Sequence, residues 1–377
     1  MKILAIETSC DETSVSVLEK IDNCIKVKSN IISSSIPLHK QTGGIVPENA
    51  AREQLKMMIP VIIKALIDSI EKTDKGKALN DFKLGNDILI NEIGSIAVTL
   101  GPGLIGSLLV GVETAKTISF VLDKPLIPVH HLLAHLYANF LENPNTSFPF
   151  VGLIVSGGHT DLLYFKSHNK YEWLGGTRDD AAGEALDKIG KLLGLSYPAG
   201  AEIEIRAKKV NKSRFNFKSP LINSDDFDFS FSGLKTEVMR EVKRIKNINQ
   251  EQLGGGQIST FQVAEGFLKG GLDEQVVNEI CFSVQKAIVN VLVKKTIKAA
   301  EKFNAQTILL GGGVSANQTL RNQMKLYATS YLPHSQIHCP PLKYCTDNAA
   351  MIGAYAFYHN KPISWEIIKA QPELYFE

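Results

Sequence analysis

Hydrophobic and polar positions follow two different periods along the amino-terminal part of the chain. Residues 3–19 begin with four apolar residues, pass through a polar turn at residues 7–13, and continue in a two-residue alternation. This is the pattern of strand, turn and half-buried strand. Apolar residues from Leu55 to Ile70 then recur at helical spacing, which predicts a long amphipathic helix. Strands followed by helices indicate a mixed α/β protein.

The strand–turn–strand pattern occurs again about half a chain later. Apolar residues 151–155 lead into the small polar turn of residues 156–160, and a second apolar strand continues to Phe165. A repeat of this kind predicts a duplicated α/β lobe with a cleft between the copies, so that the two turns face each other. Backbone amides in such turns can hold phosphate oxygens. For the first turn, an ordinary hairpin remains the alternative.

Glycine-rich turns precede two further helices. Residues 101–106 connect a strand to an apolar helix, and either an anion site or close packing of helix on strand explains their glycines. Residues 311–313 are three glycines before a helix, and Asn317 on the first turn of that helix can bond a sugar or a base. The polar stretches 72–95 and 247–260 are expected to be surface loops.

Composition narrows the class of protein. At 377 residues the chain suggests two lobes, and 44% hydrophobic with 21% charged residues is ordinary for a soluble globular protein. A net charge of +2 means that nucleic-acid binding would require a local basic surface. Five cysteines without a C-x-x-C pair fit a reducing compartment. No early apolar run resembles a signal peptide or a membrane span, so a cytoplasmic protein without membrane contact is expected.

One region combines aromatic and basic residues. Phenylalanines fall on alternate positions, as in strands or an aromatic platform, at Phe215, Phe217, Phe227, Phe229 and Phe231. The helix predicted over residues 235–246 is basic, and it is either a solvated face or a surface for nucleic acid.

Two histidines carry the clearest candidate chemistry. His131 and His135 are four residues apart on a predicted helix, so their imidazoles share one face and can bind one metal ion. Histidines packed without a metal are the alternative. Asp347 stands where the last helix begins, as a helix cap or a metal ligand. Asp187 lies within a predicted helix, and an ion pair with Lys191 is its simplest role.

Eight motifs, in order along nearly the whole chain, together resemble one family. They are ETSCDET (7–13), GPGLIGSLLVG (101–111), PVHHLLAH (128–135), VSGGHT (155–160), DDAAGEALDK (179–188), FSFSGLKT (229–236), GGGVSANQTLR (311–321) and CTDNAAM (345–351). The family is the tRNA N6-adenosine threonylcarbamoyltransferases, formerly described as glycoproteases.

The resemblance implies an α/β fold of two duplicated actin-like lobes, as in sugar kinases and Hsp70 ATPases, with a nucleotide cleft between them. The first lobe is expected at residues 1–130, completed by a carboxyl-terminal helix at about 345–370, and the second at 131–345. The reaction implied is transfer of the threonylcarbamoyl group from threonylcarbamoyl-AMP to the N6 amine of the adenosine 3′ of the anticodon, in tRNAs that read ANN codons.

The resemblance also assigns residues and partners. His131, His135 and Asp347 match the ligands of one divalent metal ion, with iron(II) expected and zinc as the alternative, whereas His130 matches no ligand. Asp11 and Glu12 match acidic positions with a role toward metal or phosphate. The implied partners are tRNA, a paralogous actin-like subunit and a small ATPase. The positions that match contacts to the adenylate are Ile154, Val155, Ser156, Gly157, Gly158, Asp187, Gly200, Glu204 and Asn317.

Two other enzyme classes compete with this interpretation. A zincin-type metalloprotease requires a glutamate directly after the first histidine, and residues 132–134 are Leu-Leu-Ala. An actin-like kinase or ATPase would transfer a phosphoryl group and does not need the paired histidines.

Overall fold

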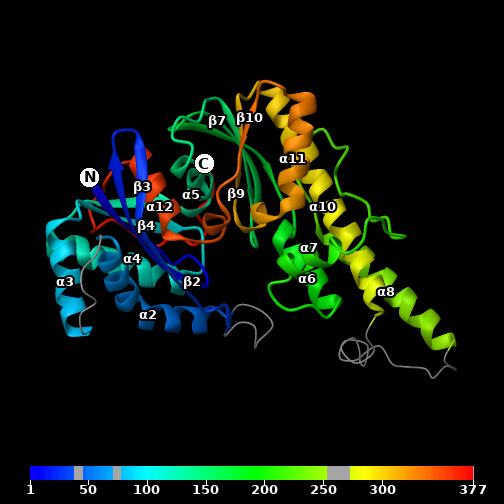
Figure 1. The fold of residues 1–377 in the computed structure, drawn as a ribbon, viewed down its shortest axis with the longest axis horizontal. Coiled ribbons are helices and arrows are strands. Elements are labelled where there is room, and N and C mark those ends of the chain that lie inside the picture. The colour runs from blue at the N-terminus through cyan, green and yellow to red at the C-terminus, as the bar shows by residue number, and fades with distance from the viewer. Residues whose placement is uncertain (38–45, 71–77, 253–271, 377) are drawn as a thin grey trace.

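The computed structural model describes residues 1–37, 46–70, 78–252 and 272–376, which form two five-stranded sheets with helices around them (Figure 1). In the first sheet the strand order is β3-β2-β1-β4-β5. In the second it is β10-β9-β6-β7-β8. Each sheet has a central strand with an antiparallel hairpin partner on one side and a parallel strand on the other. The predicted duplication is therefore confirmed.

The first sheet is built from the amino-terminal third of the chain. Its strands are β1 (Lys2–Glu7), β2 (Glu12–Ile21), β3 (Cys24–Ser34), β4 (Ser95–Gly101) and β5 (Leu126–His130). The helices α2 (Pro47–Asp68), α3 (Ala78–Asn91) and α4 (Ile105–Leu122) pack beside them. The side chains of Met58, Ile62 and Leu66 from the predicted apolar stripe of α2 are buried against β1, β2 and β4.

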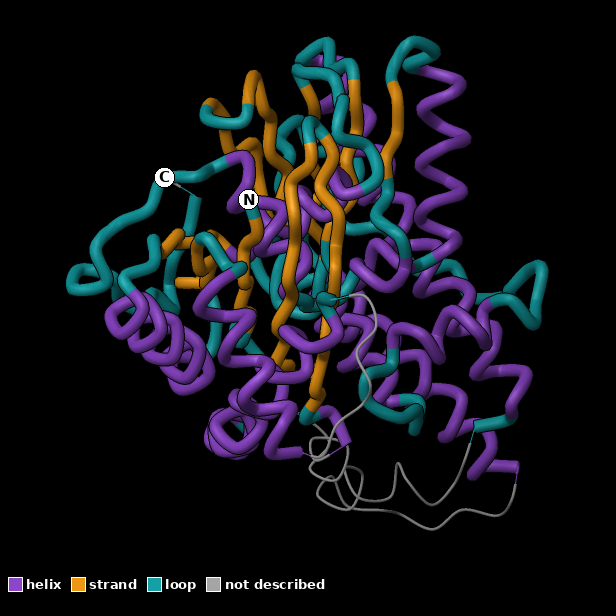
Figure 2. The backbone as a smooth tube through the Cα atoms, turned by 60° about the vertical axis from the view of Figure 1, so that its left-hand side comes forward, coloured by secondary structure: helices purple, strands orange, loops and turns teal. Residues whose placement is uncertain are grey.

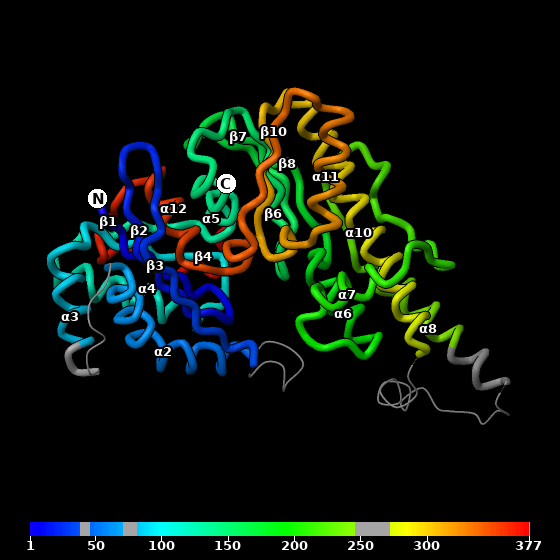
Figure 3. The backbone as a smooth tube through the Cα atoms, in the orientation of Figure 1, coloured from blue at the N-terminus to red at the C-terminus, as the bar shows by residue number. Residues whose placement is uncertain are grey.

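The second sheet follows the same plan, with more helices beside it among the described residues. Its strands are β6 (Phe150–Val155), β7 (Thr160–Ser167), β8 (Lys170–Gly176), β9 (Thr307–Gly311) and β10 (Gln336–His338). The helices are α6 (Ala182–Leu192), α7 (Gly200–Ala207), α8 (Ser232–Gln252), α10 (Glu274–Lys302) and α11 (Gln318–Tyr331). Figure 3 shows α8 extending away from the rest of this half.

Two helices lie between the sheets. They are α5 (His131–Tyr137), continued by a short 3-10 turn (Ala138–Leu141), and α12 (Ala349–Tyr358). One continuous hydrophobic cluster joins their side chains to both sheets, for example Ala5 of β1 and Ile154 of β6. In Figure 1 the red helix α12 lies with the blue strands of the first sheet, although it is the last helix of the chain. In the turned view of Figure 2, helices flank the strands on more than one side.

The expectation of a surface loop over residues 72–95 is wrong for most of that stretch. Residues 78–91 form helix α3, which packs on α2, while residues 71–77 lie outside the described residues. Leu84 and Ile88 are one helical turn apart and contribute to the hydrophobic core. The polar composition of the stretch concealed this spacing. The expected surface loop at residues 247–260 is also wrong for residues 247–252, which continue helix α8, while residues 253–271 lie outside the described residues.

Two described helices, α4 and α10, have the length and apolar composition of a membrane-spanning helix. These properties are weak evidence for a membrane span, because the core helix of a soluble protein has the same length and composition. The most apolar stretch of α10 is 78% buried inside the molecule, and that of α4 is 33% buried.

The carboxyl-terminal segment packs against the end of β4, at Gly101. A Cβ atom at this position would lie 1.8 Å from the carbonyl oxygen of Gln371, and the Gln371 N–H donates to the Leu100 carbonyl at 2.8 Å. We expect Gly101→Ala to lower the free energy of unfolding by about 1–3 kcal/mol, because backbone rather than a side chain must move. Denaturant titration measures this change.

Gly233→Ala is the matched control. Nothing lies within 4 Å of a Cβ atom at this helical position, so alanine should be neutral or stabilise the protein by up to about 1 kcal/mol. Equal stability of Gly101→Ala and the unchanged protein would contradict the close approach.

Candidate metal centre and cleft

The site begins where three neighbouring parallel strands end. β1 ends at Glu7, β4 passes through Thr99, and β5 ends at His130 immediately before His131 opens α5. Because β1, β4 and β5 run in the same direction, their carboxyl ends meet at one edge of the sheet. Buried polar side chains therefore converge on this edge.

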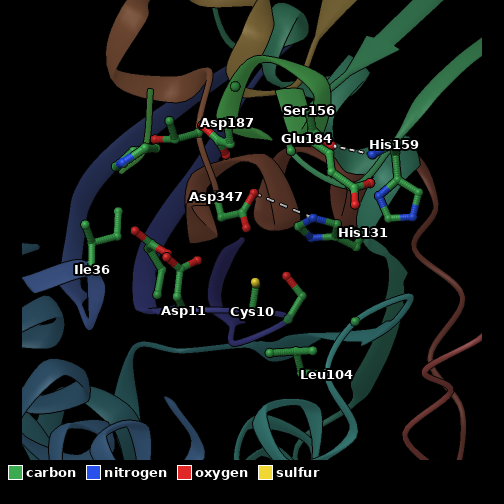
Figure 4. Close-up of a pocket in the computed structure, with 18 of the residues that line it drawn as sticks. Cys10, Asp11, Ile36, Leu104, His131, Ser156, His159, Glu184, Asp187 and Asp347 are labelled. Atoms are coloured by element: carbon green, nitrogen blue, oxygen red, sulfur yellow. Dashed lines mark hydrogen bonds and ion pairs between the residues drawn. The ribbon is translucent and has the colours of Figure 1, made fainter. Parts of the chain in front are cut away.

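The predicted metal ligands come together. The Nε2 atom of His135 lies 3.3 Å from Oδ1 of Asp347, and Nε2 of His131 lies 3.6 Å from the same oxygen. One ligand atom from each of the three residues lies within 4.8 Å of the other two. Figure 4 shows Asp347 and His131 pointing toward each other across the site. The arrangement can hold a single metal ion.

Asp347 does not cap helix α12. The cap is the next residue, Asn348, whose side-chain oxygen accepts the N–H of Met351 at 3.1 Å. This leaves the Asp347 carboxylate directed at the histidines. The cap interpretation of Asp347 is wrong because the helix begins one residue later than that interpretation requires.

The donor set fits a divalent ion of intermediate hardness. Two imidazoles and one carboxylate are typical ligands of iron(II) and zinc. Both ring nitrogens of His135 are buried without a well-formed hydrogen bond among the described residues, and Nε2 faces Oδ1 of Asp347 at 3.3 Å. Coordination of an ion by Nε2 would satisfy this buried atom.

Charges within the cluster oppose the effect of burial. Burial disfavours an ionised Asp347, but His131 and His135 lower the pKa of that carboxyl to about 2. Burial also disfavours protonated His131, but Glu7 and Asp347 raise the pKa of this imidazole to about 9. Without an ion, the proton of His131 is the positive charge that balances the carboxylates, and an ion must displace it from Nε2.

His130 has a different environment from its neighbour. Its ring stacks on Phe376 with centroids 5.2 Å apart and an interplanar angle of 7°. Burial, together with the charge of His131, lowers the pKa of His130 to about 3. This residue therefore packs against the carboxyl-terminal segment, as expected of a histidine that is not a ligand.

A cavity of about 580 Å³ opens beside the metal ligands. The two duplicated turns line it from opposite lobes, Ser9 to Glu12 on one side and Ser156 to His159 on the other. Its volume suits a nucleotide-sized ligand. The predicted cleft between facing turns is therefore present.

Four of the nine positions that match adenylate contacts line this cavity. They are Ser156, Gly157, Gly158 and Asp187. Nothing lies within 4 Å of a Cβ atom built at Gly157 or Gly158, so a ligand can approach the backbone there. Asp187 accepts the N–H of Ala199 at 2.7 Å, which orients the Tyr197–Ala199 turn. This contact, rather than an ion pair with Lys191, is the role that the structure gives to Asp187.

The other five positions lie behind or beside the cavity wall. Ile154 and Val155 are fully buried in β6 and support the glycine turn. Asn317 caps α11 by accepting the Leu320 N–H at 2.9 Å and donates to Gln285 at 2.8 Å. Glu204 accepts the N–H of Gln318 at 3.0 Å, next to that cap, and Gly200 begins α7. These residues hold α7 and α11 together at the side of the site.

The three glycines of residues 311–313 serve two purposes. Cβ atoms at Gly311 and Gly312 would lie 2.9 Å from the His135 backbone and 2.4 Å from the Val155 carbonyl oxygen. Gly313 lines the cavity, and its nearest neighbour, the Thr346 methyl group, is 3.8 Å from a Cβ position. Close packing therefore explains the first two glycines, and only the third leaves room for a ligand.

The prediction of an aromatic platform from the five alternating phenylalanines is wrong. All five phenylalanines are buried, between 0% exposed for Phe229 and 8% for Phe215, and pack into the core of the second lobe. In contrast, the basic side chains of Arg240, Lys243 and Arg244 on α8 are exposed. An alternation of aromatic residues is compatible with an exposed platform and with a buried row of side chains. The sequence did not distinguish these two possibilities.

The sequence motifs contained other cavity residues whose role was not assigned. His159 of the glycine turn faces the metal ligands, and Glu184 lies near it in the wall (Figure 4). Burial, together with the charge of His131, lowers the pKa of His159 to about 4. Tyr197 and Cys10 also line the cavity. Only the fold brings these residues to one place.

Two similar lobes, a cleft between them and a His-His-Asp cluster are the features of an actin-like fold with a site that could hold a metal ion. The profile of the family described as tRNA N6-adenosine threonylcarbamoyltransferase matches residues 26–354. Proteins of this description from Thermosipho africanus and Syntrophomonas wolfei are 42% and 41% identical to the chain, over 99% of it and over 99% and 97% of their own lengths. The chain belongs to the tRNA N6-adenosine threonylcarbamoyltransferase family.

Solved structures support the fold. Full-length HypF in the phosphate- and nucleotide-bound form has a TM-score of 0.50 at 13% identity and covers 97% of this chain and 47% of its own. HypF is an actin-like ATPase-fold protein, so the predicted fold class is confirmed. At this identity the likeness concerns the fold alone.

The metal centre is tested by removing its histidines. We expect the double variant His131→Ala, His135→Ala to lose all bound metal in elemental analysis, because only the Asp347 carboxylate would remain of the three ligands.

His130→Ala is the matched control. It removes a neighbouring buried imidazole outside the cluster, and the purified variant should keep the metal content of the unchanged protein. Metal retained in full by the double variant would place the ion elsewhere.

Proposed function

We propose that this protein transfers the threonylcarbamoyl group from threonylcarbamoyl-AMP to the N6 amine of the adenosine 3′ of the anticodon in tRNAs that read ANN codons. A bond forms between N6 and the carbamoyl carbon, the bond from that carbon to the phosphate oxygen breaks, and AMP and a proton leave. The observation that carries the proposal is the His-His-Asp cluster at the floor of a nucleotide-sized cleft in a chain of this family.

The chain's own residues would act mainly by positioning. The donor is already an activated anhydride, so the reaction needs no serine or cysteine nucleophile. The open backbone at Gly157 and Gly158 offers a place for the phosphate group. Asp187 and the turn that it orients are placed to contact the nucleoside, with the layer of Glu204 and Asn317 behind them.

One divalent ion, iron(II) with zinc as the alternative, is proposed to bind His131, His135 and Asp347. When bound, it would supply a positive charge that holds and polarises the donor. Two imidazoles and one carboxylate leave coordination positions open for substrate oxygens. Asp11 and Glu12 lie close to Asp347, and the three carboxylates lie within 4.8 Å of one another. They are placed to influence the charge of the same region.

The competing enzyme classes have less support. The relatives are described as threonylcarbamoyltransferases, which favours neither a metalloprotease nor a kinase. Leu132, Leu133 and Ala134 between the ligands are buried and offer no general base.

We also propose a paralogous actin-like subunit and a small ATPase as protein partners, in the cytoplasm. Apolar side chains at one-turn intervals on the adjacent helices α2 and α4 support a docking surface: Leu55 is 70% and Ile59 53% exposed, and Ile105 is 50% and Leu109 44% exposed. The proposed lobes, residues 1–130 with about 345–370 and residues 131–345, are supported by the packing of α12 on β1, β2 and β3.

Donor binding is tested with AMP and a non-reactive threonylcarbamoyl-adenylate analogue. By linkage, the analogue at one hundred times its Kd should stabilise the protein by about 2.7 kcal/mol, measured as a rise in Tm. Asp187→Ala should reduce this rise, because it removes a carboxylate from the cavity wall and frees the Ala199 turn.

Lys191→Ala is the control on the same helix, since its side chain is exposed and outside the cavity. Asn317→Asp is preferable to Asn317→Ala for the neighbouring position, because aspartate preserves the helix cap, which alanine would lose at a cost of about 1 kcal/mol. An unchanged Tm at saturating analogue would refute the proposed cleft.

Binding of tRNA is tested on helix α8. Charge reversal at Arg240, Lys243 and Arg244 should weaken tRNA binding and make it less dependent on salt. With fewer phosphate contacts, binding releases fewer counterions from the tRNA. Arg244 contributes least in this proposal, since it already donates to Glu241 at 2.6 Å. The measurements are a salt-dependent titration with partner proteins present and the anticodon-loop nucleosides of cells depleted of the protein and complemented with each variant.

Reversal of Lys26, Lys170 and Lys325 changes the net charge equally at exposed positions outside α8 and should leave tRNA binding intact. If depletion leaves the threonylcarbamoyl nucleoside unchanged, the proposed activity is wrong. If the α8 variant binds tRNA as tightly as the unchanged protein, the tRNA surface lies elsewhere.

A further inference from the structure

Glu7 is a buried carboxylate next to the metal cluster but outside it. Its side chain is fully buried at the end of β1, in the edge of the first sheet where β1, β4 and β5 end together. A carboxylate in such a place is costly unless its oxygens are fully hydrogen-bonded. The surroundings of Glu7 meet this requirement with three different donors.

Each donor comes from a different segment. The Ser9 N–H donates to Oε1 of Glu7 at 2.5 Å, and the Thr99 hydroxyl donates to Oε2 at 2.5 Å. The third contact joins Oε2 to Nδ1 of His131 at 3.1 Å. Both oxygens of Glu7 are therefore acceptors, one from a backbone N–H and the other from a hydroxyl.

These contacts determine which nitrogen of His131 carries the hydrogen. Since both oxygens of Glu7 already accept hydrogen bonds from other groups, Nδ1 of His131 is the donor in the third contact. In the neutral imidazole the lone pair then lies on Nε2, the atom that faces Asp347 at 3.6 Å. The Ser9 N–H holds the other oxygen of the carboxylate in place, and the Thr99 hydroxyl adds a link to β4.

We propose that Glu7 is a positioning residue for the metal centre, which sets the tautomer and ring orientation of His131 so that Nε2 binds the ion. The inference rests on the proposed metal site. It adds a carboxylate–histidine–metal arrangement, in which an outer carboxylate orients a ligand and raises its basicity.

The second histidine lacks such support. Nδ1 of His135 has no hydrogen-bond partner among the described residues, and the ring is confined by burial instead. Glu7 therefore supports only one of the two imidazoles. His131 is also the ligand whose ring borders the cavity, so its orientation bears directly on where the ion would meet a substrate.

A purely structural role for Glu7 is the competing explanation. The same carboxylate ties β1 to β4 through Thr99 and closes the turn at Ser9, so its loss would also affect the stability of the sheet edge. The two roles are separable because Thr99 donates to Glu7, whereas no hydrogen bond joins the described residues Thr99 and His131. Removal of the Thr99 hydroxyl disturbs the network but leaves the contact to the ligand.

The test measures zinc affinity in the full chain by competition with a chromophoric chelator at fixed pH. Glu7→Gln should bind zinc about 10- to 100-fold more weakly, because an amide replaces one acceptor by a donor and removes the charge. Glu7→Asp keeps the charge but shortens the side chain by one methylene, which moves the carboxylate away from His131. This variant should also bind zinc more weakly. Thr99→Val should retain the affinity of the unchanged protein. Cobalt(II) absorption spectra report whether the ligand geometry differs between these variants.

Thermal unfolding of the metal-free forms shows which variants are folded and how much each is destabilised. If folded Glu7→Gln or Glu7→Asp binds zinc as tightly as the unchanged protein, the inference is wrong and the metal site stands. Equal weakening by Thr99→Val and Glu7→Gln would assign Glu7 a structural role and overturn the inference. If the unchanged protein binds zinc no better than His131→Ala, the proposed metal site fails, and the inference fails with it.

Discussion

The burial of helix α5 between the two sheets is the constraint on which the site depends. All seven residues of this short helix are buried, including both histidines. Its apolar side chains belong to a hydrophobic cluster with residues of β1, β5, β6 and α12. So short a helix would not be stable alone in water, so tertiary packing has to hold it. The packing of both lobes thereby determines where the two imidazoles lie.

This packing withdraws Glu7, His131 and His135 from water, while the Asp347 side chain remains 23% exposed at the cavity. Glu7, His131, His135 and Asp347 would each be unfavourable alone in such surroundings. Together they compensate one another, since each carboxylate faces an imidazole at 3.1–3.6 Å. Replacing one member would leave another buried charge without its partner, which is more damaging than replacing the whole set. The cluster is therefore best understood as one unit.

Much of this arrangement could be predicted from the sequence, for reasons that are local. The strand–turn–strand repeat could be read from its apolar runs, although β2 is buried on both faces at residues 13–18 rather than half-buried as the alternation predicted. The spacing of His131 and His135 follows from helical geometry. The resemblance then brought Asp347 to them across more than two hundred residues. Helix α3 was missed because its polar residues outweighed the apolar pair Leu84 and Ile88.

Other features depend on contacts that no local pattern contains. The alternating phenylalanines at 227–231 fit exposure or burial equally, and only the position of α10 decides between them. The role of Glu7 requires Thr99 and His131 to lie beside it, which follows from the parallel order of β1, β4 and β5. Asn317 was correctly placed near a helix start, but its capping of α11 depends on a boundary one residue away from the prediction.

The duplication also explains how one cleft can offer two kinds of chemistry. The first turn carries Asp11 and Glu12, and burial together with Asp11 and Asp347 raises the pKa of Glu12 to about 10. The equivalent turn of the second lobe carries Gly157 and Gly158, with open backbone and no carboxylate. The first turn therefore offers carboxyl groups beside Asp347, and the second offers open backbone. Equivalent positions of two similar lobes have thus diverged, so that the two walls of one cleft differ in chemistry.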